Sequence, residues 1–487
     1  MGASEKSSTR SAVLTELYEF AMADGYYSCG LGETIACFDL FFRRVPDNGG
    51  FAIMAGLQQV IEHLQNLHFS EEDLRFLRTQ GISEPFLDYL RDFHFACDVW
   101  AIPEGTPIFP NEPIVKVRGP VVQAQMIETA LLLCINQQSL IATKANRLVR
   151  AARGTAVAEF GTRRAQGFDE AVYGARAAYI GGCTATSGVL PAREFGIPVL
   201  QTMIHSWVQM FDSEYEAFCA YARRYPDDCT FVVDTYDTLR SGVPNAIRAF
   251  NDVLLPLGRR PKSVRIDSGD IPYLSKRVRK MLDEAGFPDC GILASNSLDE
   301  HIISDMLAQG AKVDCFIVGE RLITSASSPL FGGVYKLCAV EQPDGRIVPK
   351  INLSENVHKI TIPSSKNVYR LFDMDSGKAI ADVLTTDSEE LDDSKPYELF
   401  DPDYTWKRKE IENYVARPLL VQIFKKGECV YSSPTPAEIR EYCSEQVDTL
   451  WDEVKRFENP HKYYVDLSAK LWEIRKLLIE EYKGVRK

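Results

Sequence analysis

Seven short apolar runs in the middle of the chain each end in a turn whose side chains could bind or transform a small ligand. The turns are marked by Phe160, Cys183, His205, Asp234, Asp267, Asn296 and Gly319. Their spacing runs from 22 residues, between Cys183 and His205, to 33 residues, between Asp234 and Asp267. One strand plus one helix takes up about this length, so the spacing predicts seven βα units. Because the carboxyl ends of parallel strands meet at one edge, we expect these turns to form one site.

His205 is the residue of this set best suited to proton transfer or nucleophilic chemistry. It lies in VLQTMIHSWVQMF, residues 199–211, which predicts a buried strand, a turn and a helix with Ser206 as its N-cap. An imidazole at the end of a parallel strand would lie where α/β folds place their chemistry. The alternative is a core histidine whose ring is satisfied by its neighbours.

The motif RIDSGD places two charges on one strand. Arg265 and Asp267 are two residues apart, so on a strand both side chains point to the same side. Unpaired charges inside a barrel are costly, so a ligand, a metal or mutual pairing must satisfy them. Arg265 could clamp a carboxylate, and Asp267 could bind ribose hydroxyls or Mg²⁺. The alternative is an internal salt bridge.

Glycine loops that cradle phosphates are absent from the sequence. No GxxxxGK[ST] motif occurs, and GLGETI at Gly30 lacks the third glycine of the dinucleotide pattern. A phosphate would therefore be held by basic side chains, helix N-termini and a metal. The basic residues that could do so include Arg163 and Arg164 in one turn and Lys359, Lys366 and Arg370 in one segment. Each of them could instead be an ordinary solvated surface charge.

Composition excludes several classes of protein. A net charge of −13 over 487 residues argues against a nucleic-acid surface. The 12 cysteines include no CxxC pair and lie mostly in apolar runs, which is typical of a reducing compartment. No apolar run reaches the ~18 residues that span a bilayer. We therefore expect a soluble cytoplasmic protein that binds neither nucleic acid nor membrane.

The order of patterns predicts an α/β protein with an irregular or incomplete TIM-like barrel, an N-terminal α/β domain and a helical C-terminal segment. Residues 1–150 form the N-terminal domain, and residues 151–345 contain the repeated units of the barrel. Residues 346–395 are a basic strand segment that returns to the active site. Residues 396–487 are expected to be a mainly helical domain, because the last fifty residues show amphipathic periodicity.

Five motifs taken together resemble the nicotinate phosphoribosyltransferases. They are FGTRRAQG, QTMIHSWVQMF, RIDSGD, ASNSLDE and GGVYKL, and the resemblance extends from LTELYEFAM to SENVHKITIPSSKNVYR. It implies a type II phosphoribosyltransferase fold and a homodimer with shared active sites. It also implies transfer of the phosphoribosyl group of phosphoribosyl pyrophosphate to nicotinate, giving nicotinate mononucleotide and pyrophosphate. ATP hydrolysis would be coupled to this first step of NAD salvage, with Mg²⁺ as cofactor, and the enzyme would be classed as a ligase.

The resemblance also implies roles for individual residues. His205, Arg265 and Asp267 would be catalytic: His205 phosphorylated by ATP, Arg265 on the carboxylate, and Asp267 on the ribose or on Mg²⁺ through phosphate. The substrate-binding residues would be Tyr18 and Phe160 on the two faces of the pyridine ring, Arg163 on the nucleotide phosphate or ring edge, Thr184 and Asp234 in neighbouring turns, Asn296 and Gly319 at the phosphate, and Lys359 and Lys366 on pyrophosphate.

Three residues depart from the family pattern. Three other functions remain as alternatives. Glu16 stands where Asp is more common, Ser364 where a glycine is usual, and Glu320 where a small Thr is usual. A quinolinate-using relative should need more cationic groups for its two carboxylates. In nicotinamide-using relatives an acid occupies the turn GGCTAT, where this chain has Thr184. The third rival is a barrel that binds nucleotides without catalysis.

Overall fold

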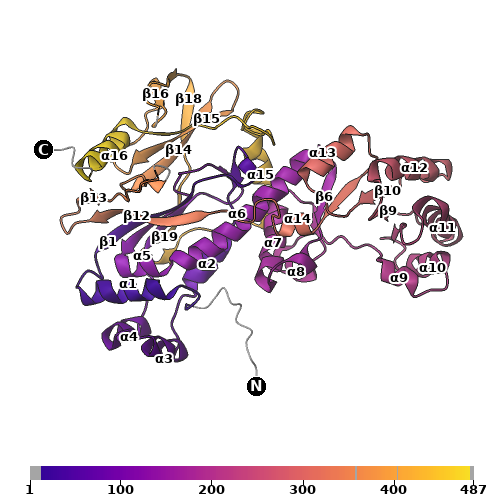
Figure 1. Ribbon diagram of the computed structural model, residues 1–487, viewed down its shortest axis with the longest axis horizontal. Coiled ribbons are helices and arrows are strands. Elements are labelled where there is room, and N and C mark those ends of the chain that lie inside the picture. Colours follow the sequence, from indigo (N-terminus) through magenta and orange to yellow (C-terminus); the bar gives the residue numbers. More distant parts are fainter. Residues whose placement is uncertain (1–11, 357–358, 403, 483–487) are drawn as a thin grey trace. The chain divides into compact units, whose positions relative to one another are not determined.

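The computed structural model describes residues 12–356, 359–402 and 404–482. The chain divides into two compact units (Figure 1). Unit 1 comprises Met1–Leu140 and Leu330–Lys487, and unit 2 comprises Ile141–Pro329. No helix in the described part of the chain is long and apolar enough to cross a membrane.

Unit 2 is built on six parallel strands that form a curled half-barrel in the order β7-β6-β11-β10-β9-β8. Their bounds are β6 (Ala156–Glu159), β7 (Ala185–Thr186), β8 (Thr230–Val232), β9 (Ser263–Ile266), β10 (Gly291–Ala294) and β11 (Cys315–Val318). Every residue of β8 and β9 is buried, as expected of parallel strands covered on both faces. The mixed α/β class and the incomplete barrel predicted from the repeats are confirmed.

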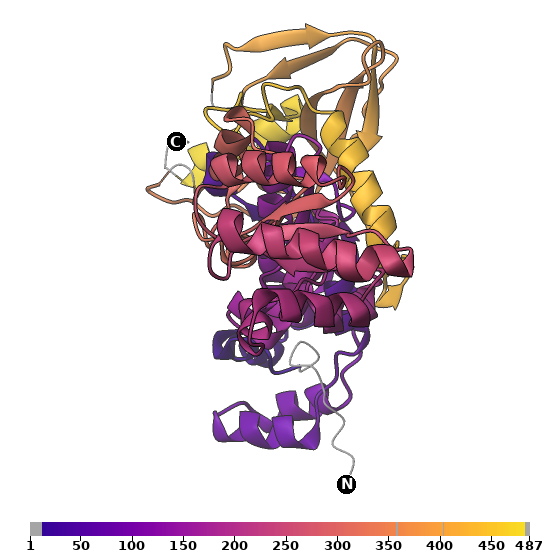
Figure 2. The same ribbon diagram turned by 90° about the vertical axis from the view of Figure 1, so that its right-hand side faces the viewer.

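Helices connect the strands of unit 2 and cover their outer side. They are α7 (Phe168–Ile180), α8 (Val189–Phe195), α9 (His205–Gln209), α10 (Glu214–Arg224), α11 (Val243–Ala249), α12 (Ile271–Glu284), α13 (Glu300–Ala308) and α14 (Glu320–Ile323). Helix α12 contacts both β9 and β10, and α11 and α13 contact α12. Figure 2 shows several helices of this unit as neighbouring rows on the side that faces the viewer.

Two of the seven predicted strands are wrong. Residues 177–180 end helix α7, because the Ala-rich run favours a helix, and β7 starts only at Ala185. Residues 199–204 make only a single parallel bridge, Thr186 to Val199, instead of a strand. Pro198 has no N–H with which to extend that ladder. His205 is therefore the first residue of α9, Ile204 is the N-cap, and Ser206 is not.

Unit 1 combines the two ends of the chain in one antiparallel sheet of seven strands, β13-β12-β1-β5-β3-β19-β20. The strands of unit 1 are β1 (Ile35–Phe42), β2 (Ala52–Ile53), β3 (Asp98–Ala101), β4 (Pro107–Ile108), β5 (Val115–Pro120), β12 (Gly333–Glu341), β13 (Ile347–Pro349), β14 (Lys366–Asp373), β15 (Ala379–Thr386), β16 (Tyr397–Phe400), β17 (Arg408–Ile411), β18 (Tyr414–Pro418), β19 (Val421–Lys425), β20 (Glu428–Cys429) and β21 (Val465–Leu467). Strand β1 lies between β5 and β12, and Leu40 pairs with both Val115 and Tyr335. These residues belong to one buried hydrophobic cluster.

Helices and smaller sheets complete unit 1. The helices are α1 (Leu17–Ser28), α2 (Leu57–Gln65), α3 (Glu71–Thr79), α4 (Glu84–Arg91), α5 (Val121–Met126), α15 (Pro436–Asp448) and α16 (Ala469–Tyr482), and α6 (Glu128–Ala151) continues from unit 1 into unit 2. A second sheet has the order β18-β14-β15-β21.

The structure does not confirm a mainly helical C-terminal segment. Beyond residue 396 the described residues contain the six strands β16 to β21, and two helices, α15 and α16. The helical periodicity of the last fifty residues corresponds to α15 and α16, and it does not continue towards residue 396. Strands β18 and β19 carry β-branched and aromatic residues, which pair with β14 and β3.

Candidate active site

Arg265 is the centre of a group of polar side chains at the carboxyl end of the half-barrel in unit 2. Its guanidinium donates from Nε to Ser295 Oγ at 2.9 Å, from Nη1 to Thr202 Oγ1 at 3.0 Å and from Nη2 to Asp267 Oδ1 at 2.9 Å. These bonds use three of the five N–H donors of an arginine. Among the residues that the structure describes, no partner takes the other two, one on each terminal nitrogen.

The ring of Phe160 lies beside this guanidinium. Arg265 Cζ is 5.9 Å from the ring centroid, and the side chain of Arg265 is only 8% exposed. Phe160 follows β6 directly, and its backbone N–H donates to Val318 O at 2.7 Å, which fixes it against β11. A flat ligand on the Phe160 ring could therefore direct an anionic substituent to the two free N–H groups of Arg265.

Asp267 is bound on one oxygen and open on the other. Its Oδ1 accepts from Arg265 and from the Ser295 hydroxyl, while Oδ2 lies 3.5 Å from His205 Nε2. Burial opposes ionisation of Asp267, but the charge of Arg265 and the Ser295 hydrogen bond outweigh it and lower the pKa of the carboxyl. Asp267 is therefore an anion at neutral pH, and its free oxygen can meet a positive charge or a hydroxyl.

His205 joins this group from the first turn of α9. Its Nδ1 is 3.1 Å from Thr235 Oγ1, and its side chain is 40% exposed. A neutral imidazole with its proton on Nε2, directed at Asp267, and with Nδ1 accepting from Thr235 satisfies both contacts. The predicted functional interpretation of His205 fits this geometry better than a buried core histidine does.

Asp234 lies next to Asp267 and keeps one oxygen without a hydrogen-bond partner. Its Oδ2 accepts from the backbone N–H of Asp267 at 3.0 Å and from Ser268 Oγ at 2.6 Å. Its Oδ1 is buried and has no donor among the described residues. A buried carboxylate oxygen without a partner costs stability, so a ligand hydroxyl or a cation is expected there.

Of the remaining predicted residues of unit 2, three are exposed and Gly319 is half-buried. Arg163 and Asn296 are exposed, and Asn296 has φ of 92°. Thr184 is also exposed, and its hydroxyl donates to Val157 O at 3.2 Å. A Cβ on Gly319 would lie 3.1 Å from Phe160 O, so glycine permits the close approach of these two turns.

Three predicted residues belong to unit 1. Tyr18 on α1 is 44% exposed, and partial burial together with the nearby Glu128 raises its pKa. Lys359 is exposed. Lys366 is 2% exposed, and its Nζ contacts Asp39 Oδ2 at 2.6 Å and donates to Ile362 O at 2.8 Å. The predicted roles of these residues at the ligand remain predictions.

The departures from the family pattern have structural explanations. Ser364 has φ of 76°, in the left-handed region that favours glycine, which explains why a glycine is usual there. Glu320 opens helix α14, and an acidic residue in the first turn of a helix is favourable. It also accepts a hydrogen bond from Ser297 Oγ at 2.8 Å.

Sequence reasoning missed the hydroxyl residues that hold the charged ones, namely Thr202, Thr235 and Ser295. Each lies within a few residues of a predicted turn, so the signal that could have found them is a hydroxyl next to a strand-end charge. Their partners could not be read from the sequence, because each bond joins different βα units.

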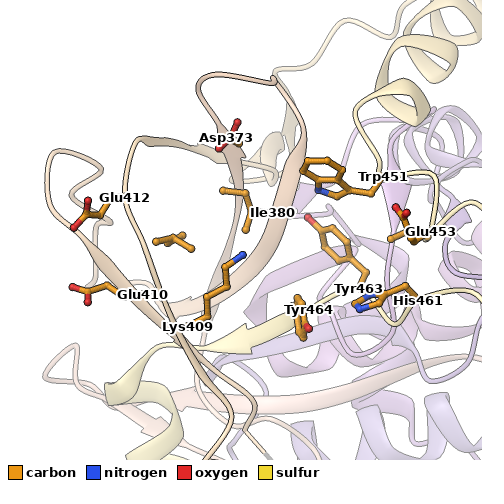
Figure 3. A pocket seen from close by; sticks show the side chains of 12 residues that line it. Asp373, Ile380, Lys409, Glu410, Glu412, Trp451, Glu453, His461, Tyr463 and Tyr464 are labelled. Atoms are coloured by element: carbon orange, nitrogen blue, oxygen red, sulfur yellow. The ribbon is translucent and has the colours of Figure 1, made fainter.

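A separate hollow of about 450 Å³ in unit 1 contains none of the predicted site residues. Its lining residues are Asp373, Ile380, Lys409, Glu410, Ile411, Glu412, Trp451, Glu453, Val454, His461, Tyr463 and Tyr464. Figure 3 shows Lys409 pointing into the hollow, whereas Glu410 and Glu412 point away from it. Lys409 is the single lysine or arginine among these lining residues, and four of the others are acidic, so they form no anion-binding arrangement comparable to that of Arg265.

Comparison with known proteins identifies the family of the chain. Residues 13–136 match the nicotinate phosphoribosyltransferase N-terminal domain, and residues 365–475 match the C-terminal domain. Nicotinate phosphoribosyltransferase of Bacillus subtilis is 44% identical over 96% of this chain and 95% of its own length. The Homo sapiens protein of the same name is 30% identical over 97% of this chain and 98% of its own length.

A solved structure agrees with these sequence matches. The crystal structure of human nicotinic acid phosphoribosyltransferase superimposes with a TM-score of 0.84 and 28% identity, covering 96% of this chain and 100% of the human one. The chain therefore belongs to the nicotinate phosphoribosyltransferase family.

Proposed function

We propose that this chain transfers the phosphoribosyl group of phosphoribosyl pyrophosphate to nicotinate, giving nicotinate mononucleotide and pyrophosphate, the first step of NAD salvage from nicotinate. Membership of the family supports the reaction. The observation that carries it in the structure is Arg265, which keeps one N–H free on each terminal nitrogen beside the ring of Phe160. An aromatic ring with one carboxylate is the ligand that this pair of groups fits.

Nicotinate would lie on Phe160 and direct its carboxylate to Arg265. A guanidinium offers donors only, so it pairs with both oxygens of a carboxylate but leaves the NH₂ of a carboxamide without an acceptor. Thr184 stands where an acid would accept that NH₂ group. Use of nicotinamide is the alternative outcome of a substrate assay, and absence of any turnover would favour a nucleotide-binding protein.

The ring nitrogen of nicotinate would form the new bond to the anomeric carbon as the bond from that carbon to pyrophosphate breaks. Positive charge develops on the sugar during this exchange, and the open oxygens of Asp267 and Asp234 would stabilise it or bind the ribose hydroxyls. Arg163, Asn296 and Gly319 would hold the 5′-phosphate. Lys359 and Lys366 would balance the charge of pyrophosphate, and for Lys366 this requires its contacts in unit 1 to be exchanged.

Mg²⁺ is the proposed cofactor, and the donor set has oxygens that fit it. Asp234 Oδ1 is buried without a partner, and carboxylate oxygens are preferred ligands of Mg²⁺. Within the described residues no group of three or more His, Cys, Asp or Glu could hold a metal. Asp234 and Asp267 would therefore share the ion with phosphate oxygens, where it would neutralise charge on the leaving pyrophosphate.

We further propose that ATP transfers its γ-phosphoryl group to His205 and releases ADP, and that hydrolysis of this phosphohistidine to inorganic phosphate is coupled to transfer, as in a ligase. The exposed imidazole carries a lone pair on Nδ1 when Nε2–H is directed at Asp267, and the hydrogen bond from Thr235 would be released as this nitrogen attacks ATP. A phosphoryl group there would add negative charge next to Asp267 and so favour rearrangement of the turns around it.

We also propose a cytoplasmic location. The twelve cysteines are all free, which supports this location.

We propose a homodimer in which Tyr18 of one copy faces Phe160 of the other across the ligand. Tyr18 is an exposed aromatic residue, as such a role requires. An obligate interface of this kind should bury more than ~2,000 Å². Tyr18→Ala and Arg265→Ala should each be nearly inactive, and mixed dimers should recover up to one working site. An active monomer, or no recovery after verified subunit exchange, would contradict the shared site.

The proposed function is tested by incubating the purified protein with nicotinate, phosphoribosyl pyrophosphate and Mg²⁺, with and without ATP, and by separating the products chromatographically. Nicotinate mononucleotide should form in both reactions, with a higher yield when ATP is present. If no mononucleotide forms under either condition, the proposal is wrong.

A further inference from the structure

Ser295 closes a ring of hydrogen bonds between the two charged residues of the site. Its Oγ accepts from Arg265 Nε at 2.9 Å, and its single O–H donates to Asp267 Oδ1. Arg265 Nη2 also donates to Asp267 Oδ1, so each of the three side chains is bonded to the other two. A serine hydroxyl has one donor, and here the acceptor of that donor is fixed by geometry.

The position of Ser295 is itself set by the sheet. Its backbone N–H donates to Ile266 O at 3.1 Å, which extends the pairing of β10 with β9 by one residue. Ser295 is 2% exposed, so water does not compete for its hydroxyl. The ring is therefore held by the scaffold before any ligand arrives.

The ring determines which edge of each charged group faces the ligand. On Arg265 it occupies Nε and one N–H of Nη2. Because Thr202 takes one N–H of Nη1, one N–H on each terminal nitrogen is left for a carboxylate. On Asp267 it occupies Oδ1, which leaves Oδ2 towards His205. Without Ser295, Asp267 Oδ2 could turn to Nε and close the common bidentate pair on Nε and Nη2. This closure would shift the guanidinium from its position beside the Phe160 ring and withdraw Oδ2 from His205.

We infer that Ser295 is a positioning residue that sets the preference of the site for a carboxylate over a carboxamide by preventing bidentate closure of Arg265 on Asp267. This inference rests on the proposed function, because it concerns the group of nicotinate that Arg265 would bind. It assigns a role to a residue whose hydroxyl is bonded to Arg265 and Asp267.

The test compares kcat/KM for nicotinate and for nicotinamide in wild type, Ser295→Ala, Ser295→Thr and Ser263→Ala. Ser263 is a matched control: it is buried at 3% exposure, lies at the other end of β9, and its Oγ is 2.7 Å from Thr230 Oγ1. Ser295→Ala should lower the ratio of nicotinate to nicotinamide use at least tenfold, mainly through a higher KM for nicotinate. Ser295→Thr keeps the hydroxyl and should restore most of the ratio, and Ser263→Ala should leave it unchanged.

The outcomes separate this inference from the proposed function. If wild type makes no nicotinate mononucleotide, the proposed function fails first. If wild type is active and folded Ser295→Ala keeps the wild-type ratio, Ser295 does not position Arg265. Should Ser295→Ala not fold, Ser295→Cys replaces it, because a thiol leaves no cavity at this position but is a weak donor. A wild-type ratio in Ser295→Cys would overturn the inference, and a lowered ratio would support it.

Discussion

Two arginine–aspartate pairs in this molecule, one in each unit, differ in what their neighbours leave open. In unit 1, Arg370 donates to both oxygens of Asp382 at 2.8 and 2.6 Å, and both side chains are 0% exposed. The Tyr463 hydroxyl adds a third bond to Asp382 at 2.9 Å. In unit 2, Arg265 uses one oxygen of Asp267, and Asp267 is 29% exposed.

The difference separates a structural ion pair from a ligand site. The rings of Phe109 and Tyr463 lie 5.2 and 5.9 Å from Arg370 Cζ, so no ligand can reach that guanidinium. Glu112 lies beside the pair, and burial and the charge of Asp382 raise the pKa of its carboxyl. Ionic pairing alone therefore says little about function, whereas donors and acceptors left open at an accessible edge are informative.

Removal of the site arginine should cause the largest effect on activity. Arg265→Ala should lower kcat/KM for nicotinate by ~10³ to 10⁴-fold, about 4 to 5.5 kcal/mol, because the carboxylate loses both of its donors. Steady-state kinetics measure the loss, and circular dichroism checks the fold. Arg265→Lys should recover little, since an ammonium cannot form the fork. An activity within tenfold of wild type would exclude carboxylate binding by Arg265.

Removal of the structural arginine should act on stability instead. Arg370→Ala leaves Asp382 buried without its cation and should lower the free energy of unfolding by about 3–5 kcal/mol. Urea denaturation measures this change. The fraction that remains folded should keep a normal KM for nicotinate. A stability equal to wild type, or a selective loss of nicotinate binding, would show that the two pairs do not differ as described.

His205→Ala should remove the coupling to ATP without abolishing transfer. The reason is that the imidazole would carry the phosphoryl group, while Arg265 and Asp267 remain to bind the reactants. The stimulation of product yield by ATP should disappear, together with an acid-labile, alkali-stable phosphate detected after incubation with labelled ATP. Complete loss of both activities in a folded variant would contradict this division of roles.

Replacement of Asp466 in unit 1 should have the smallest effect, and the effect is on stability. Unlike the ionised Asp267, Asp466 holds a proton in the folded protein up to about pH 7. Burial and the nearby Asp401 raise the pKa of Asp466 to about 7. The native state therefore holds a proton that the unfolded state loses near pH 4, so stability falls as pH rises from about 4 to 7. Asp466→Asn removes this penalty and should stabilise the protein by about 1–3 kcal/mol at pH 8 and by little at pH 4. Equal effects at both pH values would show that Asp466 is ionised in the folded protein.

The sequence predicted the parts of the site that depend on local pattern. The β9 run before Asp267 and the β10 run before Asn296 are short, apolar and bounded by turns, and both form strands as expected. The strand predicted at residues 177–180 was wrong, because a short apolar segment next to glycines is compatible with either a strand or the end of a helix.

Long-range pairing could not be predicted from local pattern. Strands β1 and β12 pair although about 300 residues separate them. Local sequence patterns therefore could not predict that the N-terminal and C-terminal parts of the chain share one sheet in unit 1. The same limit applies to Ser295, whose bonds to Arg265 and Asp267 join different βα units. The motif RIDSGD indicated a charged pair, but only the structure shows which donors remain open.

Competition between nicotinate and nicotinamide in the wild-type protein tests the role of the open arginine most directly. With phosphoribosyl pyrophosphate, Mg²⁺ and ATP present, kcat/KM for nicotinate should exceed that for nicotinamide by more than tenfold, at least ~1.4 kcal/mol. The reason is that the free N–H groups of Arg265 match two carboxylate oxygens. Equal use of the two substrates, or a preference for nicotinamide, would contradict it.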